Sequence, residues 1–509
     1  MKVTKLNYIL ILLTFLAIGC SDNIEDFIPE TENITTEESK NRLNVDTNDF
    51  YKEPESFSII KNLVTDYGVN NNDNNNDSPK LQEAIDDISN QLNGNTFGKL
   101  IIPNGNYYFT DIVMKSNITI EIDQNAVLFS QSGIKRNQTM FRFGDRGPRI
   151  TNAAIIGKGK GFTVDLRRNP SRNLIVCAVR DVRNFKISNF TIEDKNSVFA
   201  SILVDIGVIN GVANWSRDGI IEKIKQNNAL RGYGLIQAYA ANNVYFNNLD
   251  CDGGVTLRIE TDNLAMKSVN KGRMIPNIGG VNDIVAKKII SRNGLAALML
   301  SPHFMENGTV TAGNIRSFNS SFAVRIERGF VEIFAANNSI NGNQHRTNVE
   351  SQFGAGSVEE VYKRGGGIFA ARLTPAAAAN SFAIAQFKAG TFSSNTRISN
   401  IKATYGTTGQ LNFNHRLYLP CEERNSNGLC KERFGKDVVF YGPSLAAVYD
   451  NTISGNGPDS EGSYNVNTLI NNNSAIGFPS NGGDRIKIDN TTPLIRGRKG
   501  CRITFTDCN

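Results

Sequence analysis

The sequence has few of the side chains that build metal and nucleotide sites. Among its 509 residues are three histidines and seven cysteines, and no group of them has the spacing of a zinc cluster. The EF-hand spacing is also missing. Gly157, Gly159 and Gly161 are followed by no helical pattern, so they predict tight corners rather than a Rossmann phosphate loop. The expected chemistry therefore requires no cofactor.

Long apolar runs are absent beyond the N-terminus. Lys2 and Lys5 precede a run over 8–18, which predicts a signal peptide over 1–19 rather than a membrane-spanning helix. The end of this run, 17–20, resembles a bacterial lipobox, so we expect Cys20 to be acylated. Ser21 in the next position favours the outer membrane, and the acidic residues after it favour the cell surface. Residues 20–55 are polar and predict a flexible tether, with membrane contact only through the lipid.

A strong charge of either sign is also absent, because the formal net charge is only +6. This balance permits a polyanionic partner without requiring one, and it does not indicate a nucleic acid. We expect a monomer.

Six cysteines remain after Cys20, and in an oxidising compartment they can pair. The short spacings predict two disulfides, Cys421 with Cys430 and Cys501 with Cys508. The other two, Cys177 and Cys251, lie in apolar runs and are expected to be buried thiols.

No long helical period separates the predicted strands, which excludes a β-α-β architecture. Short alternating runs, each followed by a turn rich in Gly, Asn or Asp, recur at 184–192, 243–249, 283–289 and 397–401. They predict an all-β solenoid of stacked coils. We place it at 56–410, with 411–509 as last coils and disulfide-containing loops packed on it.

One helix is predicted near the start of the solenoid. Leu81, Ile85, Ile88 and Leu92 recur at helical spacing, with Ser78 as N-cap. The order of Asp-Tyr-Gly at 66–68, this helix, Ile-Pro at 102–103 and a strand at 118–122 resembles the N-terminal cap of pectate-lyase-like right-handed parallel β-helices. That resemblance implies a fold and not a reaction.

The loop 70–77 consists only of Asn and Asp. Its oxygens would suit a structural calcium ion. A solvated turn is the favoured reading, since the EF-hand glutamate is missing.

Carboxylates with acid–base spacing occur at 258–262. On a strand, Arg258, Glu260 and Asp262 would share one face, with about 6.5 to 7 Å between the Cα atoms of the two acidic residues. An acid and a base with a water between them need a comparable separation. A solvated strand face is the alternative.

Neighbouring coils are expected to complete this site. Gln237 precedes Glu260 by about one coil, which predicts Gln237 beneath Glu260 and Tyr239 beneath Asp262. Arg325 and Arg328 would join the same face from a later coil, and His303 ends a further candidate strand.

These residues resemble the iota-carrageenases of glycoside hydrolase family 82, from the cap to at least Arg328. The resemblance implies an endo-acting, inverting hydrolase of β-1,4 linkages in a sulfated galactan, with Glu260 as general acid and Asp262 as general base. It also implies that Gln237 and His303 belong to the site and that Arg258 and Arg325 bind sulfate. A chloride ion bound at the site is compatible with it.

The sequence itself supports a sulfated polymer. Clefts for neutral sugars rely on tryptophan platforms, but this chain has only Trp215, whereas guanidinium forks match sulfate oxygens. Asp262 would raise the pKa of Glu260 and Arg258 would lower it, and the sequence leaves their balance open.

Two other functions remain open at this stage. A polysaccharide lyase on the same fold could use Lys267 or Arg273 as its base, although no convincing calcium site accompanies them. A non-catalytic, surface-anchored glycan-binding lipoprotein could use Glu260 and Asp262 only to accept hydrogen bonds.

Overall fold

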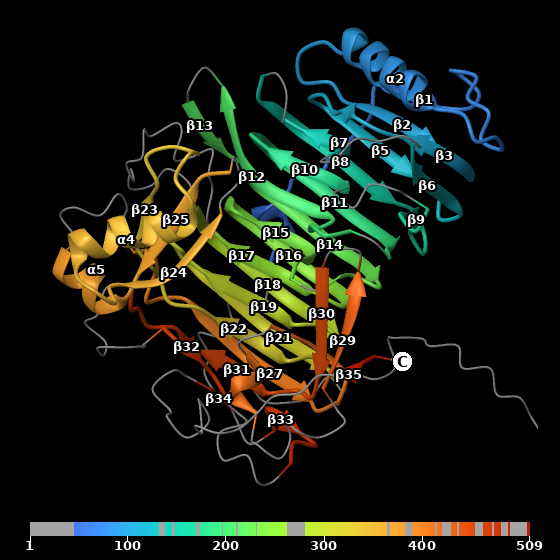
Figure 1. Cartoon of the computed structure of the whole chain (residues 1–509). Coiled ribbons are helices and arrows are strands. Elements are labelled where there is room, and N and C mark those ends of the chain that lie inside the picture. Colours follow the sequence, from blue (N-terminus) through green and yellow to red (C-terminus); the bar gives the residue numbers. More distant parts are fainter. Residues whose placement is uncertain are drawn as a thin grey trace, which may run out of the picture. The chain divides into compact units, whose positions relative to one another are not determined.

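Two long parallel sheets organise the chain, which passes from one sheet to the other in successive coils (Figure 1). This is the right-handed parallel β-helix that the sequence predicts. The computed structural model describes residues 45–508 except 132–137, 145–147, 169–173, 196, 210–211, 231, 262–279, 364–366, 382–388, 413–414, 420–428, 435–436, 453–461, 471–472, 480–486 and 489–505. In these described ranges no helix is long and apolar enough to span a membrane.

The first sheet, sheet A, has 15 strands among the described residues. In chain order they are β1 (Ile59–Asn62), β2 (Gly98–Ile102), β3 (Gly105–Phe109), β5 (Ile118–Ile122), β6 (Ala126–Ser130), β8 (Ile150–Gly157), β9 (Phe162–Asp165), β11 (Val182–Glu193), β14 (Arg217–Asn227), β16 (Ala240–Asp252), β18 (Gly280–Arg292), β21 (Val310–Phe318), β27 (Arg397–Thr404), β32 (Asn467–Thr468) and β33 (Ala475–Ile476).

The second sheet, sheet B, has 11 strands within the same ranges, all parallel except β13. They are β4 (Ile112–Val113), β7 (Gln138–Phe143), β10 (Leu174–Arg180), β12 (Ile202–Ile209), β13 (Val212–Trp215), β15 (Gly234–Ala238), β17 (Val255–Glu260), β19 (Ala296–Ser301), β22 (Phe322–Ile326), β31 (Ala446–Asp450) and β34 (Lys487–Ile488).

The core lies between the sheets because every second side chain of each strand points inward. Ile187, Ile221, Phe246 and Ala286 pair in register on four successive strands of sheet A, and all four are fully buried. Each coil therefore packs on the same residue position of the next, and replacing Phe246 with alanine would cost about 3–5 kcal/mol.

Asparagine side chains stack along one corner of the coils. Asn117, Asn152 and Asn184 have φ values of +62°, +55° and +53°, a conformation that asparagine tolerates. Asn152 Nδ2 donates to Asn117 Oδ1 at 2.7 Å, and Asn184 Nδ2 donates to Asn152 Oδ1 at 2.8 Å. The Asn-rich turns of the sequence thus link neighbouring coils by hydrogen bonds.

Helix α2 (Ser78–Gln91) packs on β2 at the N-terminal end of the stack (Figure 1). Its buried face includes Leu81, Ile85 and Ile88, as the helical spacing predicts. The predicted N-cap was wrong by one residue. Asp77 is the cap, and Ser78 begins the helix, with its hydroxyl oxygen accepting a hydrogen bond from the Thr110 amide at 2.9 Å.

A smaller layer interrupts the solenoid between β22 and β27, which the sequence reading missed. It consists of the antiparallel strands β23 (Glu332–Phe334), β24 (Val358–Lys363) and β25 (Phe369–Leu373) with helices α4 (Gly342–Phe353) and α5 (Pro375–Ser381). The polar sequence of α4 has little amphipathic pattern, so its start is marked mainly by Asn341, whose side chain caps the helix by accepting from the Gln344 amide. The short strands β20 (Glu306–Asn307), which precedes β21, and β26 (Thr391–Phe392), which precedes β27, pair in parallel with each other.

The C-terminal part adds strands to the solenoid and one further sheet. β31 pairs with β22 in sheet B, whereas β32 and β33 pair with β27 in sheet A. The further sheet has the order β28 (Gly409–Leu411), β30 (Asp437–Gly442), β29 (Cys430–Phe434) and β35 (Thr506–Asp507).

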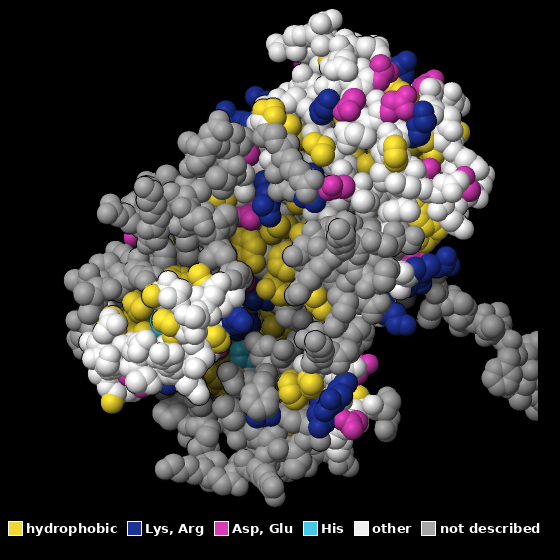
Figure 2. All heavy atoms as spheres, turned by 45° about the horizontal axis from the view of Figure 1, so that its top comes forward, with side chains coloured by type: hydrophobic (Ala, Val, Ile, Leu, Met, Phe, Trp, Pro, Cys, Tyr) yellow, Lys and Arg dark blue, Asp and Glu magenta, His cyan; other side chains and the backbone are white. Residues whose placement is uncertain are grey.

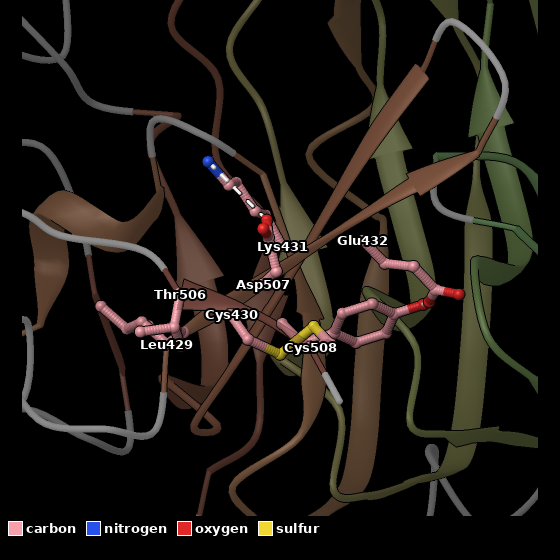
Figure 3. The surroundings of a disulfide bond; sticks show 8 residues. Leu429, Cys430, Lys431, Glu432, Thr506, Asp507 and Cys508 are labelled. Carbon is pink, nitrogen blue, oxygen red and sulfur yellow. Dashed lines mark hydrogen bonds and ion pairs between the residues drawn. A yellow bond between two sulfur atoms is a disulfide. The ribbon is translucent and has the colours of Figure 1, made fainter.

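The disulfide pairing predicted from short spacings was wrong. Cys430 is bonded to Cys508, at a sequence separation of 78 residues (Figure 3). The parallel pairing of β29 with β35 places Cys430 beside Thr506, and the Cys508 amide donates to the Lys431 carbonyl at 3.0 Å. Sheet pairing therefore decides this partner rather than chain proximity. The proposed partners Cys421 and Cys501 lie outside the described residues.

The structure agrees with the predicted buried thiols and with the predicted turn in the Asn/Asp loop 70–77. Cys177 and Cys251 are buried free thiols, as predicted. In the Asx loop, the Asn75 amide donates to Asp73 Oδ1 at 2.9 Å and the Asn72 amide donates to Asn70 Oδ1 at 3.2 Å. These are the bonds of a turn.

Candidate active site

A cavity of about 540 Å³ opens over sheet B and is lined mainly by polar atoms. Its walls come from β17, β19 and β22, from β24 and β25 of the smaller layer, and from β30 of the C-terminal sheet. On the hollowed face in Figure 2, hydrophobic and basic side chains gather in the depression. Segments far apart in the sequence thus enclose one site.

Arg258 and Glu260 form a two-bonded ion pair on β17 in this cavity. Because alternate residues of a strand share a face, the two side chains point the same way. Arg258 Nε donates to Glu260 Oε2 at 2.9 Å, and its Nη2 donates to Oε1 at 2.8 Å. The same guanidinium donates to the Gly232 carbonyl and lies over the Tyr233 ring, 4.7 Å from its centroid. Glu260 is therefore held in one orientation.

His303 contacts the same carboxylate from the loop after β19. Its Nε2 lies 3.1 Å from Glu260 Oε1, and its ring packs against Phe330 with centroids 4.6 Å apart. Burial raises the pKa of Glu260, but the charges and hydrogen bonds of Arg258 and His303 outweigh it and hold this pKa well below the usual value. The surroundings of Glu260 therefore favour its ionised form over the protonated acid.

Gln237 reaches Glu260, but by a different register from the predicted one. On β15 it pairs with Arg258, two residues short of Glu260. Its buried side chain Nε2 donates to the backbone carbonyl of Glu260 at 3.1 Å. The same register brings Tyr239 to the level of Glu260 rather than of Asp262. Burial and then the Glu260 charge raise the pKa of Tyr239 well above its usual value.

The glycine at the start of β15 explains why these strands approach so closely. Gly234 pairs with Val255 at a φ of +123°, and a Cβ there would lie 2.3 Å from the Val255 carbonyl oxygen. A larger residue would push β15 away from β17 and displace Gln237.

Asp262 lies outside the described residues, as do Lys267 and Arg273. The described part of β17 ends at Glu260.

A second Arg–Glu pair lies two strands away in the same cavity, where the sequence repeats the pattern of 258–260. Arg325 on β22 is in register with Met299 and, one strand further, with Arg258. Arg325 Nε donates to Glu327 Oε1 at 2.5 Å, and Asn451 Nδ2 donates to Glu327 Oε2 at 3.0 Å. The repeated Arg-Ile-Glu at 325–327 was a usable signal for Glu327. Nothing local points to Asn451, which β31 delivers.

Arg328 lines the cavity from the loop after β22 rather than from the strand face that was predicted. Its Nη2 donates to Glu359 Oε2 at 2.5 Å, which joins β24 of the smaller layer to the solenoid. Arg372 of β25 also lines the cavity, with its guanidinium 3.6 Å from the centroid of the Phe330 ring. The sequence did not predict Glu359 or Arg372 as site residues because it did not predict the smaller layer that carries them.

Within the described residues, no three His, Cys, Asp or Glu side chains gather as a metal site. The arrangement is a carboxylate held by a guanidinium and an imidazole, with further arginines along the cavity. It can donate or accept a proton at Glu260 and bind anionic groups nearby.

Comparison with known proteins assigns the family. An iota-carrageenase from Zobellia galactanivorans is 44% identical over 517 residues, covering 98% of both chains. The solved structure of the family GH82 iota-carrageenase from A. fortis, determined in the absence of chloride ions, is 37% identical, with a TM-score of 0.80 over 91% of this chain and 96% of that chain. An iota-carrageenase complexed to iota-carrageenan fragments is 36% identical, with a TM-score of 0.79 over 91% and 98%. No family model matches the chain. The chain belongs to the iota-carrageenases of glycoside hydrolase family 82.

Proposed function

We propose that the protein is an endo-acting glycoside hydrolase that cleaves β-1,4 linkages of the sulfated galactan iota-carrageenan with inversion of configuration. The observation that carries this proposal is the cluster of Glu260, Arg258 and His303 inside the cavity of a chain of this family. A buried, oriented carboxyl group beside anion-binding arginines is what cleavage of a sulfated sugar polymer needs.

In the proposed mechanism, Glu260 protonates the oxygen of the leaving sugar. Asp262 takes a proton from a water that attacks the opposite face of the ring, so that the acid and base act in one displacement. Gln237 fixes the Glu260 backbone through its bond to the carbonyl, and His303 fixes one carboxylate oxygen. No covalent intermediate is required.

Substrate binding is assigned to the basic side chains of the cavity. Arg258 and Arg325 are proposed to bind sulfate through paired N–H groups. Arg328 is proposed to bind substrate at the edge where the smaller layer meets the solenoid. Tyr239 is proposed to bind substrate beside Glu260.

The two other functions are not favoured by family membership. A lyase would release an unsaturated sugar with ultraviolet absorbance, and a binding protein would release nothing. Purified protein incubated with iota-, kappa- and lambda-carrageenan tests all three. Reducing ends without ultraviolet absorbance, from iota-carrageenan above the other two, are the expected result. Ultraviolet absorbance or no cleavage at all would overturn the proposal.

We also propose that Cys20 is lipidated and that a monomer is held on the outer membrane, facing outward. The support is the lipobox at 17–20 and the polar stretch after it. Replacing Cys20 with serine should abolish labelling by a fatty-acid analogue and release the protein from membrane pellets. A calcium or chloride ion remains an expectation, tested by activity with a chelator and in chloride-free buffer.

A further inference from the structure

The proposed acid is bound by the residue that is proposed to bind sulfate. A general acid must carry a proton before the bond breaks. Arg258 instead donates to both oxygens of Glu260, and these bonds favour the ionised carboxylate. While Glu260 is held in this pair, its ionised form is favoured, whereas its proposed role requires the protonated form.

A sulfate ester would change the charge around Arg258. The side-on edge of the guanidinium, Nε and Nη2, is occupied by Glu260, and Nη1 donates to the Gly232 carbonyl. A sulfate that takes the side-on edge displaces the carboxylate directly. A sulfate that binds end-on places a negative charge beside Arg258 and cancels its field at Glu260. In both geometries the stabilisation of ionised Glu260 falls.

We propose that substrate sulfate, on binding to Arg258, releases Glu260 to take up a proton, so that the acid is protonated only when substrate is present. This inference rests on the proposed function and deepens it. The step is a proton transfer from solvent to a Glu260 carboxylate oxygen, with no other bond made or broken. Arg258 then acts both as a sulfate ligand and as the group that sets the state of the acid.

Other charged groups near Glu260 bear on this argument. His303 contacts Oε1 from the loop after β19, and Tyr239 approaches from the end of β15. Tyr233 faces the Arg258 guanidinium. Arg325 and Glu327 occupy β22 and its end, but they bond to each other. Asp262, two residues beyond Glu260, lies outside the described residues. Among the described groups that bond to the Glu260 carboxylate, Arg258 and His303, His303 is the one that could take up the proton in its place.

The pH dependence of turnover gives the first test. The profile of kcat/KM reports the free enzyme, whereas kcat reports the complex. Because the Glu260 pKa is held down in the free enzyme and rises in the complex, the alkaline limb of kcat should lie at higher pH than that of kcat/KM. Between the two limbs KM should rise about tenfold per pH unit, and above the higher limb it should level off. Coincident limbs would overturn the proposal.

Proton uptake on mixing is the second test and does not depend on turnover. Enzyme and iota-carrageenan oligosaccharide are mixed in weak buffer with an indicator dye. The pH is set between the alkaline limb of kcat/KM and that of kcat. Wild type should take up close to one proton per enzyme, and Glu260→Gln should take up none. Glu327→Gln removes the other carboxylate that is paired with a proposed sulfate ligand, so uptake of the proton by this variant as in wild type would assign the proton to Glu260 rather than to Glu327. Uptake that persists in Glu260→Gln would place the proton on another group, such as His303 or Glu327, and would refute the proposal.

Arg258→Lys gives an independent variant should Glu260→Gln fold poorly. Lysine keeps the charge but loses the paired bonds, so the two alkaline limbs should move closer together. An unchanged separation in folded Arg258→Lys would contradict the role of Arg258. Failure of the proposed function looks different, because no reducing ends would appear at any pH while proton uptake could still be measured.

Discussion

Arg258 and Glu260, two positions apart on β17, are joined by two hydrogen bonds of 2.9 and 2.8 Å between guanidinium and carboxylate. A bidentate pair of this kind is among the stronger polar contacts in proteins, and it fixes both side chains. The proposed sulfate ligand and the proposed acid therefore share one contact. The second pair, Arg325 with Glu327, lacks the histidine and provides an internal comparison.

Arg325→Lys should raise KM for iota-carrageenan about tenfold, equivalent to about 1.4 kcal/mol, and should lower kcat less. The reason is that lysine retains the charge but cannot bind two sulfate oxygens in one plane. Steady-state kinetics measure this. Arg292→Lys on β18, outside the cavity lining and paired with Asp250, is the matched control and should leave KM unchanged. Equal kinetics in Arg325→Lys and wild type would refute the assignment of Arg325.

Gln237→Leu should lower both the free energy of unfolding, by about 1–3 kcal/mol, and kcat. The substitution removes the donor to the buried Glu260 carbonyl at nearly constant volume. Gln226→Leu is a control of the same kind in sheet A, where Gln226 donates to Asp194 at 3.1 Å. It should destabilise the fold without changing kcat of the folded protein. A Gln237→Leu enzyme with wild-type kcat would show that Gln237 does not position Glu260.

Much of the solenoid follows from local sequence, and the site follows only in part. Alternation at 184–192 or 243–249 marks strands because one side of each must be buried. Register is not local, since it depends on the length of every turn between coils. This is why Gln237 was placed opposite Glu260 although it pairs with Arg258.

Contacts between segments distant in the sequence could not be predicted either, because they also depend on which strands pair. Asn451 reaches Glu327 only because β31 returns to pair with β22, and Cys508 meets Cys430 only because β35 pairs with β29. Helix α4 has little amphipathic pattern, so the sequence did not indicate the smaller layer, which supplies Glu359.

Mass spectrometry of non-reduced peptides should find Cys430 linked to Cys508. A reductant should lower the melting temperature of wild type, because a disulfide of this kind contributes about 2–4 kcal/mol. In the double variant Cys430→Ser/Cys508→Ser this disulfide is absent, so the protein should already melt at the lower temperature. The reductant should then not lower the melting temperature by breaking this bond. A peptide linking Cys430 to Cys421 would instead restore the pairing first expected from the sequence.

The configuration of the first product tests the acid–base pair as a whole. If Glu260 protonates the leaving oxygen while Asp262 activates water on the other face, the β linkage gives an α reducing end. Proton NMR during the first minutes of hydrolysis, before mutarotation, distinguishes the two anomers. A β anomer that appears first would mean a retaining mechanism and would exclude Asp262 as a base acting through water.

The most direct measurement is the rate of reducing-end release from iota-carrageenan by Glu260→Gln. Glutamine keeps the shape of the side chain but cannot supply the proton, so kcat should fall by about a hundredfold to ten-thousandfold. Circular dichroism should show the wild-type fold, because the exchanged group faces the cavity and not the core. A folded Glu260→Gln enzyme that hydrolyses iota-carrageenan at close to the wild-type rate would contradict the role of Glu260 and move the search for the acid to Glu327.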